Sequence, residues 1–259
     1  MKRVRVNNLK FVALSSATFL FIVAIWWLVT HHVLIPVFFL PSPLAVAQAT
    51  KALFVEFSFA RDVWISVARI LAGFTVAAVL AIPIGIGIGF NRHIEAALEP
   101  LIDFIRYTPV PAFIPLFILW FGVGELEKVI VIAASVFFQL VLMVAESVHL
   151  LPDEVREFSR SLGVGRSELV HRIVWPFTKP HIYADLRISM GWAWAGLIIA
   201  EIVGASSGIG FVIIQGQRLL QTPNVIAAII VVGVLGVLTD FLFKKGDKLF
   251  FPWIVNNHK

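Results

Sequence analysis

The chain has 259 residues, of which 59% are hydrophobic and 14% charged, and its mean hydropathy is +0.91. A soluble domain is only about 45–50% apolar, so this composition excludes an ordinary soluble enzyme and indicates a membrane protein with several spans. The net charge of +5 does not indicate nucleic-acid binding, because most basic residues flank apolar segments and act there as topology signals. The absence of cysteine excludes disulfides and thiolate-bound metals.

The first apolar run covers residues 11–29, which is long enough to cross a bilayer. No small-residue cleavage site follows it, so we expect a retained span rather than a signal peptide. It follows four basic residues, Lys2, Arg3, Arg5 and Lys10. Residues 31–66 are too polar to span, and we expect an outside loop with a helix along the interface, since apolar residues recur at helical spacing within 45–53.

The second span is expected over residues 67–90, with an interruption at Pro83 and a repeat of Gly85, Gly87 and Gly89 near its end. This glycine repeat follows no strand, so it is not a dinucleotide-binding fingerprint. Small residues within an apolar helix allow a neighbouring helix to approach closely. The repeat therefore predicts a helix-packing face.

A proline-rich third span follows a short inside loop at residues 91–100. This span, expected over 101–122, contains Pro109, Pro111 and Pro115, so it must bend or break. A break at membrane depth is tolerated only where the backbone is buried in protein or lines a cavity. The third span is therefore a candidate wall of a transport pathway.

Three more spans are expected at residues 129–150, 184–204 and 225–243, after a tight outside turn at 122–128. Residues 205–223 are too short and polar to span and form an outside loop or a partly re-entrant segment. Six spans place both termini in the cytoplasm, in agreement with the positive-inside rule. Apart from Arg106 within the third span, the basic residues outside are Lys51, Arg61, Arg69, Lys128 and Arg218, and all other Lys and Arg residues are inside.

No nucleotide-binding or metalloprotease motif is found in the sequence: G-x-x-x-x-G-K-[ST] and H-E-x-x-H are both missing. The adjacent His31 and His32 are more typical of a solvated loop than of a metal site. The chain is therefore expected not to be an enzyme. Any uphill transport must draw on a gradient or on a separate subunit.

Ionisable, polar and aromatic residues inside the spans are the candidate pathway residues. They are Arg106, Pro109, Pro111, Gln139, Trp192, Trp194 and Glu201. Most have a structural alternative. Arg106 can pair with Asp103 at i and i+3, Gln139 can bond to a neighbouring helix, and Glu201 can form an ion pair, lie hydrated at the outer interface or line the mouth of the pathway. The two tryptophans face different sides of one helix, so at least one should face protein or a cavity.

The longest polar stretch, residues 152–181, lies on the inside and is flanked by turn or cap signals at Pro152 and at 178–181. Gly163 and Gly165 divide it into two short amphipathic helices. The first has an apolar face of Val155, Phe158 and Leu162. The second has Ser167 as a plausible N-cap and a stripe of Leu169, Val170, Ile173 and Val174. Two such helices meeting at a glycine predict a docking surface.

This stretch resembles the cytoplasmic signature of the permeases of binding-protein-dependent ABC importers, which reads E-A-A, three residues, G, nine residues, I-x-L-P. Glu157 begins the match, and Gly163, Ile173 and Pro176 follow at the full spacing, although both alanines and the leucine are replaced. Further matches, among them residues 106–111, extend over about 40–253 and are similar to the nitrate, sulfonate, taurine and bicarbonate branch of these permeases.

The resemblance implies an all-α membrane protein of six transmembrane helices with the methionine-importer-type fold, one permease domain over 1–259 in the bacterial inner membrane. It implies a homodimer of permeases with two ABC ATPase subunits, which hold ATP and magnesium, and an extracytoplasmic solute-binding protein; no cofactor is expected in this chain. The second short helix would be the coupling helix in a groove of the ATPase, and lipid headgroups are the alternative partner. The residues expected to carry coupling are Glu157, Gly163, Arg166, Glu168, Leu169, His171, Arg172, Ile173 and Pro176.

The expected function is import by alternating access of a small anion such as nitrate, bicarbonate or an organosulfonate such as taurine. The same machinery could carry a pyrimidine or another small organic nutrient. A gradient-driven secondary transporter would need a buried charge relay and usually an internal repeat. A membrane-embedded enzyme would need a clustered nucleophile, base or metal set.

Overall fold

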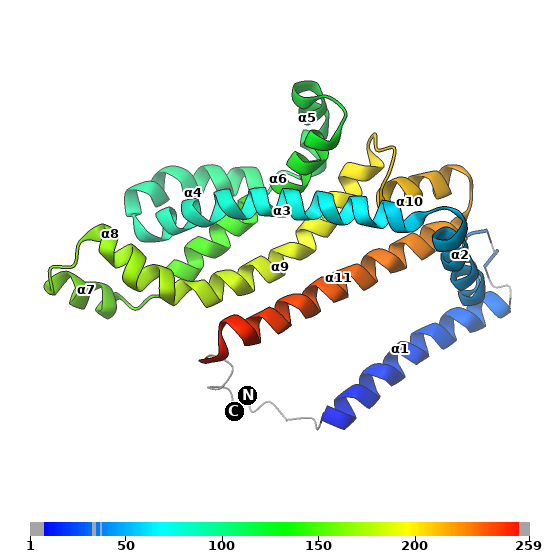
Figure 1. Cartoon of the computed structure of the whole chain (residues 1–259), viewed down its shortest axis with the longest axis horizontal. Helices are drawn as coiled ribbons and strands as arrows, with labels where there is room; N and C mark the ends of the chain where they lie inside the picture. Colours follow the sequence, from blue (N-terminus) through cyan, green and yellow to red (C-terminus); the bar gives the residue numbers. More distant parts are fainter. Residues whose placement is uncertain (1–7, 33–34, 37, 254–259) are drawn as a thin grey trace. The chain divides into compact units, whose positions relative to one another are not determined.

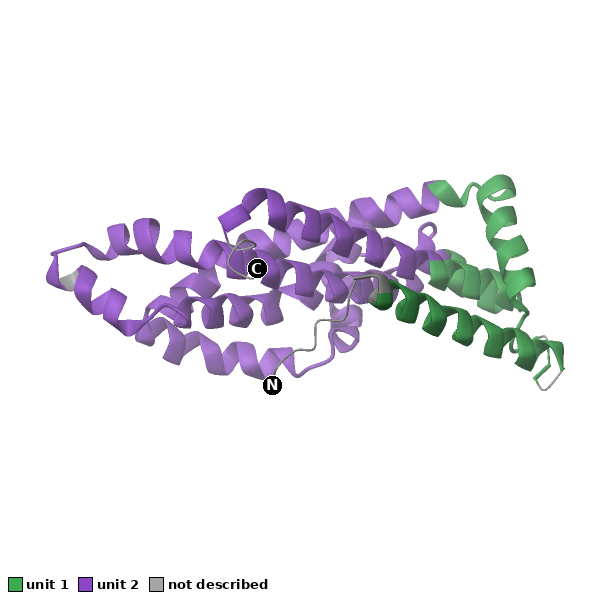
Figure 2. Cartoon of the chain, turned by 90° about the horizontal axis from the view of Figure 1, so that it is seen from below, with its two compact units in different colours: residues 1–60, 212–230 green, residues 61–211, 231–259 purple. Residues whose placement is uncertain are grey.

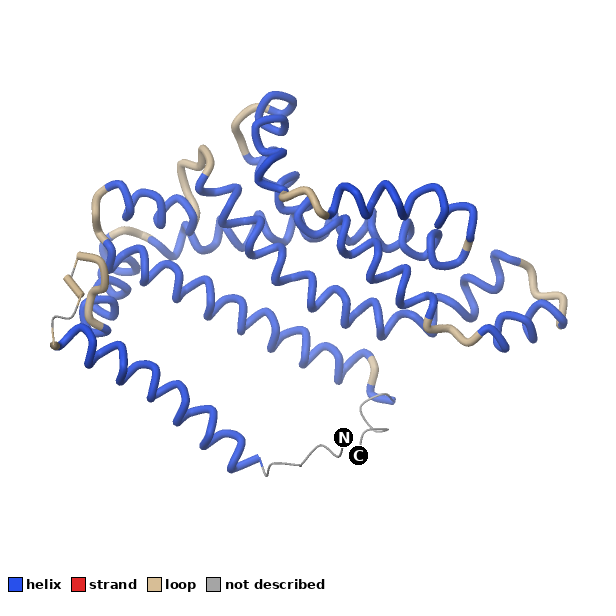
Figure 3. Tube along the Cα trace, turned by 180° about the vertical axis from the view of Figure 1, so that it is seen from behind, coloured by secondary structure: helices blue, strands red, loops and turns tan. Residues whose placement is uncertain are grey.

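The computed structural model describes residues 8–32, 35–36 and 38–253, and within these ranges every regular element is a helix (Figure 3). The basic residues at positions 2–5 lie outside the described part. The elements are α1 (Asn8–His31), α2 (Pro43–Glu56), α3 (Phe59–Phe90), α4 (Arg92–Arg106), η1 (Val110–Phe113), α5 (Ile114–Phe121), α6 (Glu125–His149), α7 (Asp153–Ser161), α8 (Arg166–Leu169), η2 (Val170–Val174), α9 (Trp175–Ile202), α10 (Ile209–Arg218) and α11 (Thr222–Phe250). They divide between two units, residues 1–60 with 212–230 and residues 61–211 with 231–259 (Figure 2).

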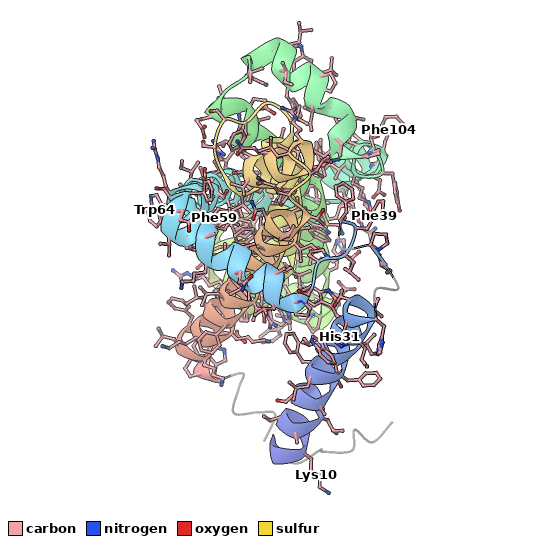
Figure 4. The ribbon with its side chains drawn as sticks, turned by 90° about the vertical axis from the view of Figure 1, so that its right-hand side faces the viewer. Lys10, His31, Phe39, Phe59, Trp64 and Phe104 are labelled. Atoms are coloured by element: carbon pink, nitrogen blue, oxygen red, sulfur yellow. The ribbon has the colours of Figure 1, made fainter. Side chains whose placement is uncertain are left out.

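In the first unit, α1 is an apolar helix in which Figure 4 labels Lys10 near its start and His31 at its end, and it is joined to the residues just before α2 by a hydrogen bond from the Trp26 indole N–H to the Pro41 carbonyl at 3.0 Å. Its side chains are largely exposed, as expected of a helix that faces lipid. α2 confirms the helix predicted within the outside loop. It begins at Pro43 because the Ser42 hydroxyl accepts a hydrogen bond from the Ala45 N–H at 3.2 Å, which caps the helix.

The second span begins earlier than the sequence suggested, because α3 starts at Phe59 rather than at residue 67. Charged residues at its start indicated a loop, but the structure gives them partners. The Asp62 carboxylate accepts a hydrogen bond from the Gly208 N–H at 2.7 Å, and Arg69 is a buried ion-pair partner rather than a loop charge. Pro83 does not interrupt the helix.

The predicted packing role of the glycine repeat is confirmed for Gly85 and Gly89, which lie against the backbone of α6. A Cβ on Gly85 would come within 2.5 Å of the Val141 carbonyl oxygen, and one on Gly89 within 2.6 Å of the Ala145 carbonyl oxygen. Gly87 faces open space instead, with its nearest neighbour, Ile94 Cδ1, 3.8 Å from an added Cβ. Of the three glycines in this repeat, only Gly85 and Gly89 therefore pack against α6.

We expect Gly85→Ala to destabilise the protein by about 1–3 kcal/mol, because the added methyl group meets backbone that cannot move aside. The matched substitution Gly87→Ala has room and raises helix propensity, so it should be neutral or slightly stabilising. Thermal unfolding of the purified variants in detergent measures the difference. Equal melting temperatures for the two variants would show that α3 and α6 do not touch at Gly85.

The inside loop predicted at residues 91–100 is instead the first part of α4, which Asn91 caps by accepting a hydrogen bond from the His93 N–H at 3.0 Å. The predicted break of the third span is confirmed. After Tyr107 the chain bends by 90° between α4 and the segment formed by η1 and α5 (Figure 1). Pro109 lies in extended backbone at this bend and precedes η1.

The remaining spans form long helices. By length and composition α1, α3, α6 and α11 can cross a membrane, and α4 with the segment of η1 and α5 passes the same test as a bent pair, either a broken span or a re-entrant loop. α9 has 28 residues, about 42 Å at the α-helical rise, and contains most of the predicted fifth span. It runs through Pro176 and Pro180, so the turn predicted at 178–181 is wrong. The predicted loop at 205–223 contains the ten-residue helix α10, which is too short to cross.

Candidate functional site

A cavity of about 390 Å³ lies along α6, beside the break between α4 and α5 and the middle of α9. We call it the aromatic cavity, because five of its twelve lining residues are Phe or Trp. Arg106 is the only charged side chain that lines it among the described residues. Its lining is Ile105, Arg106, Thr108, Val110, Phe113, Phe117, Trp120, Ala134, Ser135, Phe138, Gln139 and Trp192.

A second cavity, of about 450 Å³, continues along α6 toward its C-terminal end. We call it the acidic cavity, because four carboxylates line it with one arginine and two histidines. These charged or titratable residues are Glu99, Asp103, Glu146, Asp185, Arg106, His149 and His181. One carboxylate is held in place by α6, since the Ser147 hydroxyl donates to Asp185 Oδ2 at 2.7 Å.

Arg106 and Gln139 line both cavities and so mark where the two meet. The predicted pair with Asp103 is confirmed, with 2.7 Å between Arg106 Nε and Asp103 Oδ1. The angle at this contact is not that of a hydrogen bond, so the buried Nε–H lacks an aligned acceptor among the described residues. The guanidinium also donates to the Tyr107 hydroxyl at 3.1 Å and lies 4.7 Å from its ring centroid.

The two tryptophans of α9 face different surroundings, as their spacing of two residues predicted. Trp192 lines the aromatic cavity. Trp194 is buried, and its indole N–H donates to the Thr239 hydroxyl of α11 at 3.3 Å. Pro109 and Pro111 flank Val110 at the bend without lining either cavity. Of the predicted pathway residues, the cavities therefore bring together Arg106, Gln139 and Trp192.

Glu201 is fully buried in an ion pair, so the hydrated position at the outer interface is wrong and the structural alternative is confirmed. Its Oε1 accepts hydrogen bonds from Arg69 Nη1 and from the Ser66 hydroxyl, each at 2.7 Å, and its Oε2 accepts from the Gly210 N–H at 2.7 Å. Arg69 also donates through Nε to Glu125 at 2.7 Å. Three helices, α3, α6 and α9, are thereby tied together away from both cavities.

The predicted docking element is built from α7, α8 and η2, which Figure 1 shows at one end of their unit. Gly163 has a φ of +76° at the turn between α7 and α8, as the division of the stretch predicted. Gly165, not Ser167, is the N-cap of α8. The second helix does not end near Pro176 but passes through η2 directly into α9.

The prediction that the apolar stripe of the second helix is exposed for docking is wrong. Leu169 is 2% exposed and Val174 is fully buried, because they pack with Val148 and Leu151 in a small core; Ile173 is partly buried against the same core. A side chain that already fills this core cannot enter a partner's groove. The apolar residues that do face outward are those of the first helix, led by Phe158, which is 66% exposed.

The charged candidates of the docking element remain accessible. Glu157 and Arg166 line a polar hollow that also includes residues at the turn between α3 and α4. His171 is exposed, and Arg172 forms an exposed i,i+4 ion pair with Glu168 at 3.3 Å. The accessible surface of the element therefore combines an apolar face on α7 with charged residues on α8 and η2.

We expect Gly163→Val to cost about 1–2 kcal/mol, because a β-branched residue is strained at positive φ. The cost comes from the backbone alone, since an added Cβ would meet no atom within 4 Å. Gly163→Asn should lose only a few tenths of a kcal/mol, because asparagine tolerates the left-handed region. Chemical or thermal unfolding of the two variants compares them, and equal losses would mean that the turn does not need this conformation.

Comparisons with known proteins place these features in a transport system. The chain matches the family described as binding-protein-dependent transport system inner membrane component over residues 81–249. It is 32% identical over 232 residues to the putative aliphatic sulfonates transport permease protein SsuC of Bacillus subtilis, which covers 90% of this chain and 84% of that protein. It is 28% identical over 247 residues to the taurine transport system permease protein TauC of Escherichia coli, covering 93% and 90%.

A third relative and a solved structure extend the comparison. The chain is 32% identical over 176 residues to the bicarbonate transport system permease protein CmpB of Synechococcus elongatus, covering 68% of this chain and 63% of that protein. Its fold is similar to a chain of the inward-facing MetNI methionine ABC transporter, with a TM-score of 0.68 at 16% identity, covering 75% of this chain and 96% of the other. This likeness confirms the expected all-α, methionine-importer-type fold.

Proposed function

We propose that this chain, which belongs to the family of inner membrane components of binding-protein-dependent transport systems, carries a small anion inward. ATP hydrolysis in a partner subunit would drive this transport. It is a transport permease of the inner membrane, as the resemblance of its cytoplasmic stretch predicted. Its relatives are named for aliphatic sulfonates, taurine and bicarbonate, and these compounds define the class of solute we propose.

The proposed complex contains two copies of this chain, two ABC ATPase subunits that bind ATP and magnesium, and an extracytoplasmic solute-binding protein. We place both termini and the docking element on the cytoplasmic side, where the basic residues gather. The exposed apolar face formed by Val155 and Phe158 of α7 and by Leu162 just after it would contact a groove of the ATPase. The charged residues of α8 would lie at the rim of that contact.

One observation carries this proposal: the docking element continues as a helix into α9, which lines both cavities. A movement of the ATPase subunits would therefore be transmitted along α9 to Trp192. The core under α8 also includes Val148 at the end of α6, so α6 would move as well. In the proposed complex, α6 and α9, which both line the cavities, would thus be moved together by the ATPase through the docking element. Such a joint movement is what alternating access requires.

Co-purification is a direct test of the proposed partnership. The tagged chain, extracted from its native membrane in mild detergent, should bring with it an ATPase subunit and a second, differently tagged copy of itself. A chain lacking residues 153–161 is the matched control, since it removes α7 and leaves the spans. The proposal fails if the intact chain is recovered without an ATPase in several detergents and after crosslinking in the membrane.

A further inference from the structure

We propose that the aromatic cavity is a solute-binding site for an organic anion with an apolar body, such as an alkane- or arenesulfonate, rather than for a bare inorganic anion. The acidic group would lie at Arg106 and the apolar body among the aromatic side chains. This inference rests on the proposed function, because it names the class of anion that the pathway accepts.

The charge on this cavity favours an anion. Arg106 is its only charged lining residue among those described, while its partner Asp103 lines only the acidic cavity. A solute in the aromatic cavity therefore meets the positive charge of Arg106 and no carboxylate. A planar guanidinium can bind an oxyanion through two parallel hydrogen bonds.

The polar side chains near Arg106 suit the same group. Gln139 lies beside Arg106 in both cavities, and its amide N–H can donate to an anion oxygen. Thr108 lies at the bend between α4 and η1 and supplies a hydroxyl to the lining. Arg106, Gln139 and Thr108 are thus the donors that the lining offers, because the remaining lining is aromatic or aliphatic apart from Ser135, whose hydroxyl already donates to the Val131 carbonyl at 2.8 Å.

The size and lining of the cavity distinguish an organic anion from nitrate or bicarbonate. A water molecule takes up roughly 30 Å³ in the liquid, so an ion of four heavy atoms such as nitrate or bicarbonate would leave most of the 390 Å³ unfilled. Phe113, Phe117, Trp120, Phe138 and Trp192 would then have no solute surface to contact. Each methylene group that they remove from water should instead raise affinity roughly fourfold.

The natural absence of cysteine allows a direct test with single-cysteine variants. Ala134 lines only the aromatic cavity and Ala184 only the acidic cavity, so Ala134→Cys and Ala184→Cys form a matched pair. In the assembled complex in membranes, each thiol is treated with a sulfonate-bearing and a trimethylammonium-bearing methanethiosulfonate. The ratio of the two rates, divided by the same ratio for a free thiol, reports the charge preference of each cavity.

We expect Ala134→Cys to prefer the sulfonate reagent and Ala184→Cys to prefer the ammonium reagent. Hexanesulfonate should protect Ala134→Cys at a concentration at least tenfold lower than methanesulfonate does, and nitrate should protect it least. Adding Arg106→Gln should abolish both the charge preference and the protection. Thr108→Cys, at another position in the same lining, repeats the test.

Several outcomes overturn the inference: a preference for the ammonium reagent at Ala134→Cys, protection by nitrate equal to that by hexanesulfonate, or no reaction at either Ala134→Cys or Thr108→Cys. These results are independent of the transport assay. ATP-driven uptake without protection of the cavity thiols by hexanesulfonate would contradict only the inference. Protection of these thiols without ATP-driven uptake would contradict only the proposed function.

Discussion

Arg69→Met is expected to destabilise the protein by about 3–5 kcal/mol, the cost of leaving a buried charge without its partner. Arg69 and Glu201 are 3% and 0% exposed and lie 2.7 Å apart. The substitution removes the ion pairs that join α3 to Glu125 of α6 and to Glu201 of α9, and it leaves the Glu201 carboxylate buried. For a chain of this size the loss corresponds to a melting temperature lower by roughly 10 °C.

A double-mutant cycle separates the lost pair from lost packing. Arg69→Met combined with Glu201→Met removes both charges, so the double variant should be more stable than Arg69→Met alone, since an apolar pair of similar volume often replaces a buried ion pair without loss. Thermal unfolding in detergent, followed by tryptophan fluorescence, gives all four values. Additive losses for the two single substitutions would contradict the ion pair seen in the structure.

Phe158→Ala is expected to weaken binding of the ATPase subunit about 30-fold or more, because buried aromatic anchors dominate binding at protein interfaces. Phe158 lies on the outward face of α7 and supports no internal core, so the variant should keep the melting temperature of the unmodified chain. Titration of purified ATPase against the permease in nanodiscs measures the affinity.

Arg172→Ala provides the comparison within the same docking element. The Arg172 and Glu168 side chains are 78% and 46% exposed, and an exposed ion pair contributes about 0–1 kcal/mol. We therefore expect a change in ATPase affinity of threefold or less. A larger loss of ATPase affinity for Arg172→Ala than for Phe158→Ala would show that the main contact lies on the helix of α8 and η2 and not on α7.

Local patterns were enough to predict the spans and the turn between the two docking helices. Gly163 was recognisable because the spacing from Glu157 to Pro176 requires a glycine there, and the structure gives it a positive φ. The extent of α9 was not predictable from local rules. Residues 178–181, which include Pro180, indicated a turn, but α9 runs through both Pro176 and Pro180.

Contacts between distant residues explain what the sequence could not reveal. Arg69 and Glu201 are 132 residues apart, and each alone resembles a charge near a membrane surface. Leu169 has the periodicity of an exposed amphipathic stripe, but the end of α6 covers it. The third span was predicted to line a pathway, but its sequence did not show that Phe117 and Trp120 would line the same cavity as Arg106, on the far side of the 90° bend.

ATP-dependent uptake is the measurement that tests the proposed function most directly. Proteoliposomes containing the permease and its ATPase subunit are loaded with ATP and magnesium, and the solute-binding protein is added outside with labelled taurine, hexanesulfonate or bicarbonate. We predict uptake that requires both internal ATP and external binding protein, and that persists when ionophores collapse every ion gradient. Uptake driven by an ion gradient alone, with no ATP present, would contradict the account.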